Sequence, residues 1–95
     1  MRPDGEIGKG DAGEQAQTLA LMALGWILSD GARADRLLAL TGLDSDMLRD
    51  GLGNAAVLGA VLAFLADHEP DLVACAQELG VDPADLIAAR EALGA

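Results

Sequence analysis

The sequence is short of aromatic side chains, basic side chains and cysteine. Its 95 residues include one tryptophan, one phenylalanine, no tyrosine, one cysteine and only six lysines and arginines. A single cysteine cannot form an internal disulfide, so the composition gives no sign of an oxidising compartment. Six basic residues against sixteen acidic ones argue against nucleic-acid binding, because a nucleic-acid binder needs basic side chains to replace phosphate counterions.

Long apolar runs are also missing. The longest, Leu19–Leu28 and Ala55–Ala66, have roughly half of the ~20 residues that a membrane span needs. The start of the chain, Met1–Glu6, alternates charges with helix-breaking residues and lacks the apolar region of an export signal. We therefore expect a cytoplasmic protein with no membrane contact.

The residues that are abundant are hydrophobic and acidic. Hydrophobic residues make up 52% of the chain, and the formal net charge is −10. This apolar content excludes a chain that is disordered throughout, and the length allows one domain at most. Residues 1–13 contain four glycines and a proline among mixed charges. We expect a flexible N-terminal tail over residues 1–13 and a single helical domain over residues 14–95.

The apolar pattern after Glu14 has the period of an α-helix, and no window alternates as a strand would. The sequence predicts an all-α fold, a compact bundle of about six short helices. From Leu19 onward, the helix over 14–30 is apolar on nearly every side, as expected when other helices surround it. In the third helix, Met47, Leu48 and Leu52 are expected to point inward. The remaining helices are expected at 32–40, at 55–68, at 70–80 and from Asp82 onward.

Helix-capping residues separate these segments. Asp44 and Asn54 are expected N-caps, Gly42 and Gly80 are expected to end helices, and Asp82-Pro83-Ala84-Asp85 has the pattern of a helix start. The same order of signals recurs at an offset of 38 residues. This spacing suggests two pseudo-repeated three-helix halves, with the helices near 19–30 and 55–68 packed together at the centre.

His68 and Glu69 are the first candidates for chemistry, as a metal or acid–base pair. The structural alternative is that they end a helix, where a histidine interacts favourably with the free carbonyl groups. Cys75 lies among apolar residues with no basic neighbour in the sequence, which indicates a buried, unreactive thiol. We therefore predict no catalytic residue, no cofactor-binding residue and no metal ligand.

Two further groups have both a functional and a structural interpretation. Asp44, Asp46 and Asp50 resemble a fragment of a calcium loop, but no glutamate follows at the twelfth position, so helix capping explains them better. Trp26 fits either the core or a contact with a partner, where it would be the natural energetic centre. A homodimer that buries remaining leucine and tryptophan surface is one possibility that the composition leaves open.

The segment from Cys75 to Leu86 has the spacing of a helix-turn-helix. A DNA-binding version needs basic or amide side chains at the start of the second helix. Asp82 and Asp85 occupy that place, so their charge would repel phosphate. The pattern therefore predicts the shape of the motif without its DNA-binding chemistry.

The segments Ala23-Leu24-Gly25-Trp26 and Leu40-Thr41-Gly42-Leu43-Asp44 resemble signature segments of a bacterial family of small helical proteins of unknown function. The resemblance covers about residues 17–94. It implies an all-helical fold and transfers no functional residue. Members usually have a proline soon after the tryptophan helix, where this chain has Gly31-Ala32, so the start of the second helix is less defined.

The sequence thus predicts a non-catalytic helical protein that acts as a protein–protein interaction module. Its acidic surface would contact an unknown protein partner or a second copy of itself. One alternative is a small enzyme or ligand binder that uses His68 and Glu69. Another is a degenerate helix-turn-helix fold that now contacts protein.

Overall fold

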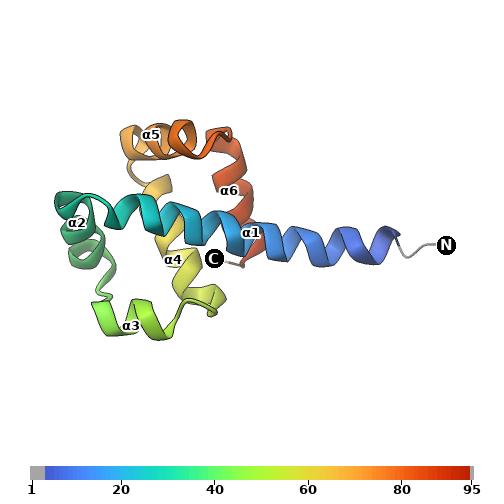
Figure 1. Ribbon diagram of the computed structural model, residues 1–95, viewed down its shortest axis with the longest axis horizontal. Helices are drawn as coiled ribbons and strands as arrows, with labels where there is room; N and C mark the ends of the chain where they lie inside the picture. The colour runs from blue at the N-terminus through green and yellow to red at the C-terminus, as the bar shows by residue number, and fades with distance from the viewer. Residues whose placement is uncertain (1–3, 95) are drawn as a thin grey trace.

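A computed structural model describes the backbone of residues 4–94 and the side chains of residues 13–94. This part of the chain forms six helices and no strand, which confirms the all-α prediction (Figure 1). No helix within it is both long enough and apolar enough to cross a membrane. The helices are α1 (Asp4–Leu28), α2 (Gly31–Thr41), α3 (Ser45–Asp50), α4 (Ala55–Ala66), α5 (Glu69–Leu79) and α6 (Pro83–Ala92).

Helices α1 and α4 form the centre of the bundle. They pack on each other, and each also packs against α2, α5 and α6. The buried face of α1 carries Ala16, Ala20 and Ala23, whereas α4 buries mainly large side chains, including Leu58 and Leu65. Small residues on one helix allow the large side chains of its neighbour to approach closely. The predicted central pairing of the two most apolar helices is confirmed.

One apolar core joins all six helices of the described chain, and α3 contributes Leu48 to it. The large side chains that are fully buried include Ile27 from α1, Leu37 from α2, Leu62 from α4 and Leu86 from α6, together with Cys75 from α5. No polar or charged residue is buried in the part of the chain whose side chains are described. Burial of apolar surface is therefore the main source of stability, although the Nε atoms of Arg33 and Arg90 are buried without a hydrogen-bond partner.

Side chains at the helix starts satisfy free backbone N–H groups, as the sequence predicts. The Oδ1 atom of Asp44 accepts a hydrogen bond from the backbone N–H of Met47 at 2.8 Å. The Oδ1 atom of Asn54 accepts one from Ala56 at 2.8 Å. At the start of α6, the backbone N–H of Asp82 donates to Oδ2 of Asp85 at 3.0 Å. These caps define where α3, α4 and α6 begin.

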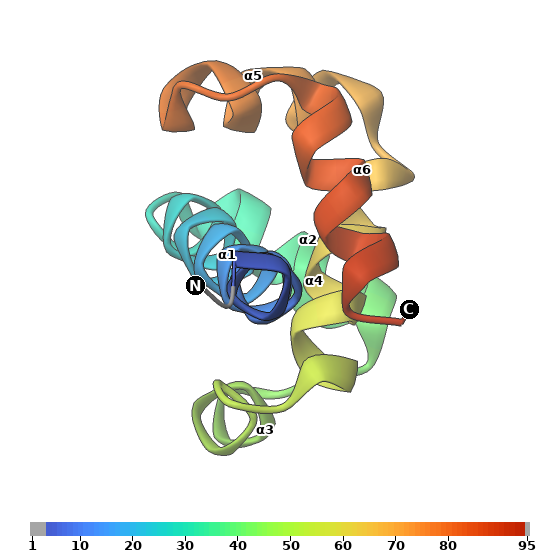
Figure 2. The same cartoon turned by 90° about the vertical axis from the view of Figure 1, so that its right-hand side faces the viewer.

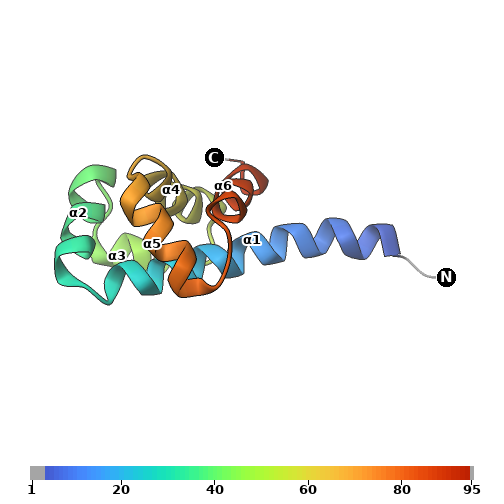
Figure 3. The ribbon, with the colours of Figure 1, turned by 90° about the horizontal axis from the view of Figure 1, so that it is seen from above.

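The start of the first helix differs from the expected position. We predicted that order begins near Glu14, but α1 begins at Asp4 and extends well beyond the other helices (Figures 1 and 3). Glycine is among the poorest helix formers, so the four glycines before Glu14 favour a tail over a helix when the sequence is considered alone. The flexibility of residues 1–13 stays a prediction.

Helix α3 is also less buried than predicted. Leu48 enters the core, but Met47 and Leu52 are 48% and 43% exposed, so the expectation that all three point inward is wrong for two of them. The physical reason is length, because six residues make fewer than two turns and can direct only one side chain into the core. Helix α3 makes no extensive contact with any other helix in the described chain.

Helix α1 is not surrounded by other helices either. Leu21, Met22 and Leu28 are among the large apolar side chains that remain exposed. Figure 2 shows α4 and α6 on one side of α1, while the opposite side carries no helix. The uniformly apolar composition of this segment therefore reflects one buried face and one exposed apolar face.

The helix boundaries follow the 38-residue offset, but the packing does not. Helices α1 and α4 end at residues 28 and 66, α2 and α5 span 31–41 and 69–79, and α3 and α6 begin at 45 and 83. However, α6 packs on both α1 and α4, whereas α3 packs extensively on neither. The two halves are thus not equivalent in space, and the repeat stays a prediction.

Gly80 ends α5 with φ of 73°, in the left-handed region that favours glycine. We expect Gly80→Ala to lower the free energy of unfolding by roughly 1 kcal/mol, because a Cβ atom is strained at this φ. Urea denaturation followed by circular dichroism measures the change. Gly53→Ala is the matched control, since Gly53 is exposed, has open space around it and does not have a positive φ. Equal losses in the two variants would contradict this explanation.

Candidate functional site

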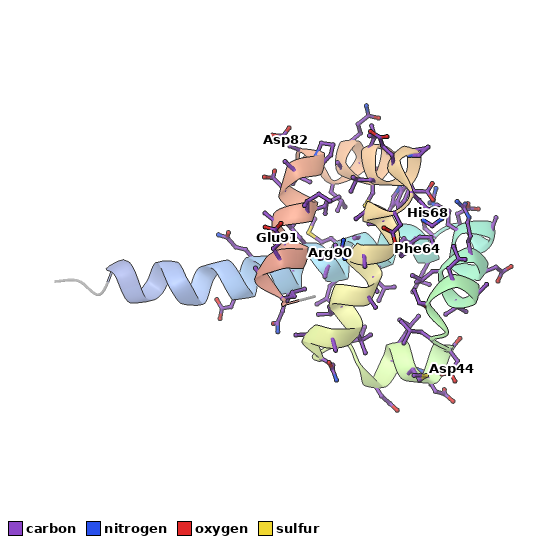
Figure 4. All side chains as sticks on the ribbon, turned by 180° about the vertical axis from the view of Figure 1, so that it is seen from behind. Asp44, Phe64, His68, Asp82, Arg90 and Glu91 are labelled. Carbon is purple, nitrogen blue, oxygen red and sulfur yellow. The ribbon has the colours of Figure 1, made fainter. Side chains whose placement is uncertain are left out.

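His68 lies between α4 and α5 and is held by the end of α4. Its Nδ1–H group donates to the carbonyl oxygen of Phe64 at 2.8 Å. The two rings stack at a tilt, with centroids 4.9 Å apart (Figure 4). The carbonyl groups of the last helical turn have no partner within the helix, and a histidine side chain can satisfy one of them. This geometry agrees with the structural interpretation of His68.

Neither Glu69, the other half of the proposed pair, nor the thiol of Cys75 joins His68. Glu69 is exposed in the first turn of α5, whereas Cys75 is buried in the core of the bundle. Among the residues whose side chains are described, no three histidines, cysteines, aspartates or glutamates lie close enough together to hold a metal ion. A small hollow of about 220 Å³ beside His68 is lined by Leu40, Thr41, Ala60, Ala63, Phe64 and Asp67 as well as His68 itself.

Burial raises the pKa of the Cys75 thiol to about 11. The charge of Arg33 acts in the opposite direction, and that of Asp71 adds to the increase. A thiol with this pKa is protonated at neutral pH and is a poor nucleophile. Cys75 therefore acts as a small apolar core residue.

The aspartates around α3 have separate structural roles. Asp44 caps the helix, and Asp46 lies 3.6 Å from the guanidinium of Arg49 in an exposed ion pair. Asp50, the last residue of α3, is exposed. These aspartates therefore resemble a calcium loop in sequence, but they do not form one shared set of ligands.

Trp26 is half-buried at the corner between α1 and α2, where Arg33 covers it. The guanidinium carbon of Arg33 lies 3.7 Å from the centroid of the Trp26 ring. Arg33 also donates hydrogen bonds to the Trp26 carbonyl oxygen at 2.9 Å and to Ser29 Oγ at 3.1 Å. The indole thus packs against the core on one side and holds a cation on the other.

A larger groove lies between α1 and α6, and neither His68, Cys75 nor Trp26 lines it. Its volume is about 710 Å³, and four of its ten lining residues are alanines, with Glu14 and Asp85 also among them. The sequence signal for it is weak, because alanine is common in any helix. The lining residues are Glu14, Gln15, Ala16, Thr18, Leu19, Val81, Asp85, Ala88, Ala89 and Ala92.

These observations define a class, a small all-helical domain with one apolar core and its described charged groups at the surface. The chain belongs to the family described as Protein of unknown function (DUF3572), whose family model matches residues 13–95. This match confirms the resemblance to a helical family of unknown function, while the bacterial origin stays a prediction. No curated protein matches the chain, and no solved structure does.

The Cys75 thiol is expected to react slowly in the folded protein. A pKa raised from 9.0 to about 11 leaves about 100-fold less thiolate near pH 8. We therefore expect alkylation by iodoacetamide to be at least that much slower in native protein than in guanidinium, as measured by mass spectrometry.

Because the pKa of the Cys75 thiol is higher in the folded protein than in the unfolded one, its contribution to stability is present below pH 9 and is lost as the pH rises through about 11. Cys75→Ala should remove this part of the decline in unfolding free energy at high pH. An unchanged decline in the variant would contradict the raised pKa of Cys75.

Arg33→Ala is expected to lower the free energy of unfolding by about 1–2 kcal/mol, because it removes the contact with the Trp26 ring and two hydrogen bonds. Arg49→Ala is the control, since Arg49 makes only an exposed ion pair within α3, and its loss should cost less than about 0.5 kcal/mol. Urea denaturation measures both variants. A cost for Arg33→Ala no larger than that of the control would refute the role of Arg33.

Proposed function

We propose that this domain is a non-catalytic protein–protein interaction module. The observation that carries the proposal is a set of exposed large apolar side chains on a surface rich in carboxylates. Six of the seven lie between residues 21 and 52, in the N-terminal half of the fold. A partner that covers such side chains removes apolar surface from water, which favours association. The seven residues are Leu21, Met22, Leu28, Leu40, Met47, Leu52 and Val73.

Surface charge supports the same proposal and favours a partner with basic groups. Arginines are few, and Arg33, Arg36 and Arg49 each have a carboxylate neighbour within 4 Å, the closest being Asp71 at 2.8 Å from Arg36. Among the acidic residues whose side chains are described, only Asp30, Asp46 and Asp71 lie within 4 Å of a basic group. An acidic surface attracts a basic protein and speeds its association.

The same charge distribution disfavours DNA as a partner. Helices α5 and α6 are joined by a short turn at Gly80, which resembles the helix-turn-helix that the spacing predicts. Asp82 and Asp85 are exposed at the start of α6, where a recognition helix would meet phosphates and bases. We propose that any use of this motif is contact with protein.

A ligand-binding function is the second candidate, because His68 lines the hollow of about 220 Å³ with Asp67 and Thr41. In this version His68 keeps its Nδ1 bond to Phe64 and offers only Nε2 to a ligand. Glu69 is not among the residues that line the hollow, and Cys75 is buried in the core. Of the proposed pair His68 and Glu69, the candidate therefore depends on His68 alone.

Affinity capture of tagged protein from its native lysate, followed by sizing of the pure protein, separates these functions. We expect wild type to recover a specific protein whose binding weakens between about 50 and 500 mM salt. Recovery should fall for Met47→Glu with Leu52→Glu, because charges would replace apolar contacts. It should be unchanged for His68→Ala.

The matched control is Ala56→Glu with Ala84→Glu, which adds the same charge at two exposed positions. Equal loss with the control pair would show that added charge alone disrupts binding. A strictly monomeric protein that recovers no specific partner would overturn the proposal. Loss of the cellular phenotype in folded His68→Ala would favour ligand binding instead.

A further inference from the structure

The groove between α1 and α6 lies where the two helices cross. Figures 1 and 2 show this crossing close to the place where α1 projects from the rest of the fold. Ala16 and Ala89 line the groove and are only 2% and 5% exposed, so they lie at its base. Ala88 and Ala92 line it with exposed methyl groups. Side chains this small leave the space between the helices unfilled, which explains a volume of about 710 Å³.

Both helices also bring a carboxylate to the groove. Glu14 of α1 and Asp85 of α6 line it and are exposed. No basic residue occurs among the described residues that line it. Asp85 accepts one hydrogen bond, from the backbone N–H of Asp82 at 3.0 Å, and a carboxylate can accept several more. The alanine base is therefore bordered by negative charge that remains accessible to a donor.

The sequence of both walls has the same sign of charge. Residues 4–18 contain four acidic residues and one lysine, and residues 81–94 contain three acidic residues and one arginine. The formal net charge of the whole chain is −10. A field of this sign attracts a basic partner to the groove and repels a second copy of the same chain. Charge complementarity therefore selects a basic occupant.

The small side chains at the base indicate the shape of this occupant. A helix that binds in a groove inserts apolar side chains spaced three and four residues apart, and small residues beneath it allow a close approach. Lysine and arginine can lay their apolar stems along such a groove while their charged groups reach carboxylates at its edge. An amphipathic helix with basic residues beside its apolar face meets both requirements.

We propose that the α1–α6 groove binds a basic amphipathic helix of another protein. The apolar side chains of that helix pack on Ala16 and Ala89, and its lysines or arginines contact the carboxylates of Glu14 and Asp85. This inference rests on the proposed interaction role and gives that role a second site, separate from the exposed apolar side chains of residues 21–52.

A synthetic peptide tests the groove with the full chain. The probe is a labelled peptide of about 18 residues with leucines on one helical face and lysines elsewhere, and its companion has glutamate in place of each lysine. By fluorescence anisotropy at about 50 mM salt, we expect a dissociation constant below about 100 µM for the basic peptide and no binding of the acidic one.

Filling the groove should block the peptide. Ala88→Phe places a large side chain in the groove at an exposed position, so we expect the affinity to fall by at least about 10-fold. Ala74→Phe is the matched control, because Ala74 is exposed on α5 and does not line the groove. It should leave the affinity unchanged. Circular dichroism verifies that both variants are folded.

Neutral variants test the carboxylates. Glu14→Gln with Asp85→Asn removes two charges but keeps an acceptor at the start of α6, and it should lower the affinity by about 3- to 30-fold and weaken its salt dependence. Asp50→Asn with Glu78→Gln removes the same charge at exposed positions outside the groove and should change the affinity by less than about twofold. Equal losses in the two pairs would overturn the contact with Glu14 and Asp85.

The outcomes separate this inference from the proposed function. No binding of the basic peptide up to about 500 µM, or equal losses with Ala88→Phe and Ala74→Phe, overturns the groove as its site. Capture of a partner that depends on Met47 and Leu52 can still succeed in either case, which would leave the interaction role intact. A dimer of wild type that Ala88→Phe dissociates would assign the groove to a second copy and overturn the basic partner.

Discussion

The contact between α1 and α4 is the interaction on which the rest of the fold depends. Alanines on α1 give the leucines and valine of α4 room to lie close to its backbone, and every other helix except α3 packs against this pair. Because the core contains no charged group, its stability comes from excluding water and from close packing. Substitution of a larger residue at Ala20 or Ala23 would therefore separate the two central helices and affect all the elements that they support.

Much of the fold follows from local signals in the sequence. The side chains of Asp44 and Asn54 cap the starts of α3 and α4, and that of Asp85 accepts a hydrogen bond at the start of α6. Glycine at position 80 tolerates a backbone conformation that other residues avoid. These effects involve residues within one turn, so the chain can be interpreted without knowledge of its partners in space. The inward-facing residues of α4 are predictable for the same reason, because Leu58, Val61, Leu62 and Leu65 follow the period of a helix with one buried face.

The errors arise where tertiary packing decides. Met47 has the apolar character of a core residue, yet α3 is too short to bury it as well as Leu48. The start of α1 is an error of a different kind, because the glycines before Glu14 disfavour a helix, yet α1 begins at Asp4. The α1–α6 groove depends on the approach of two helices that are far apart in sequence, and periodicity cannot supply that distance. For the candidate site, the sequence correctly places Cys75 in the apolar core but cannot show that His68 binds a carbonyl oxygen of α4.

The placement of the only tryptophan has a practical consequence for spectroscopy. All intrinsic indole emission originates from the corner where α1 meets α2, with the guanidinium of Arg33 against the ring. The fluorescence signal therefore monitors the surroundings of one helix junction and is insensitive to what happens on the distant side of α6. A ligand titration that leaves the emission spectrum unchanged would therefore exclude binding only at the α1–α2 junction. A second optical label on α6 would be needed to detect binding elsewhere on the molecule.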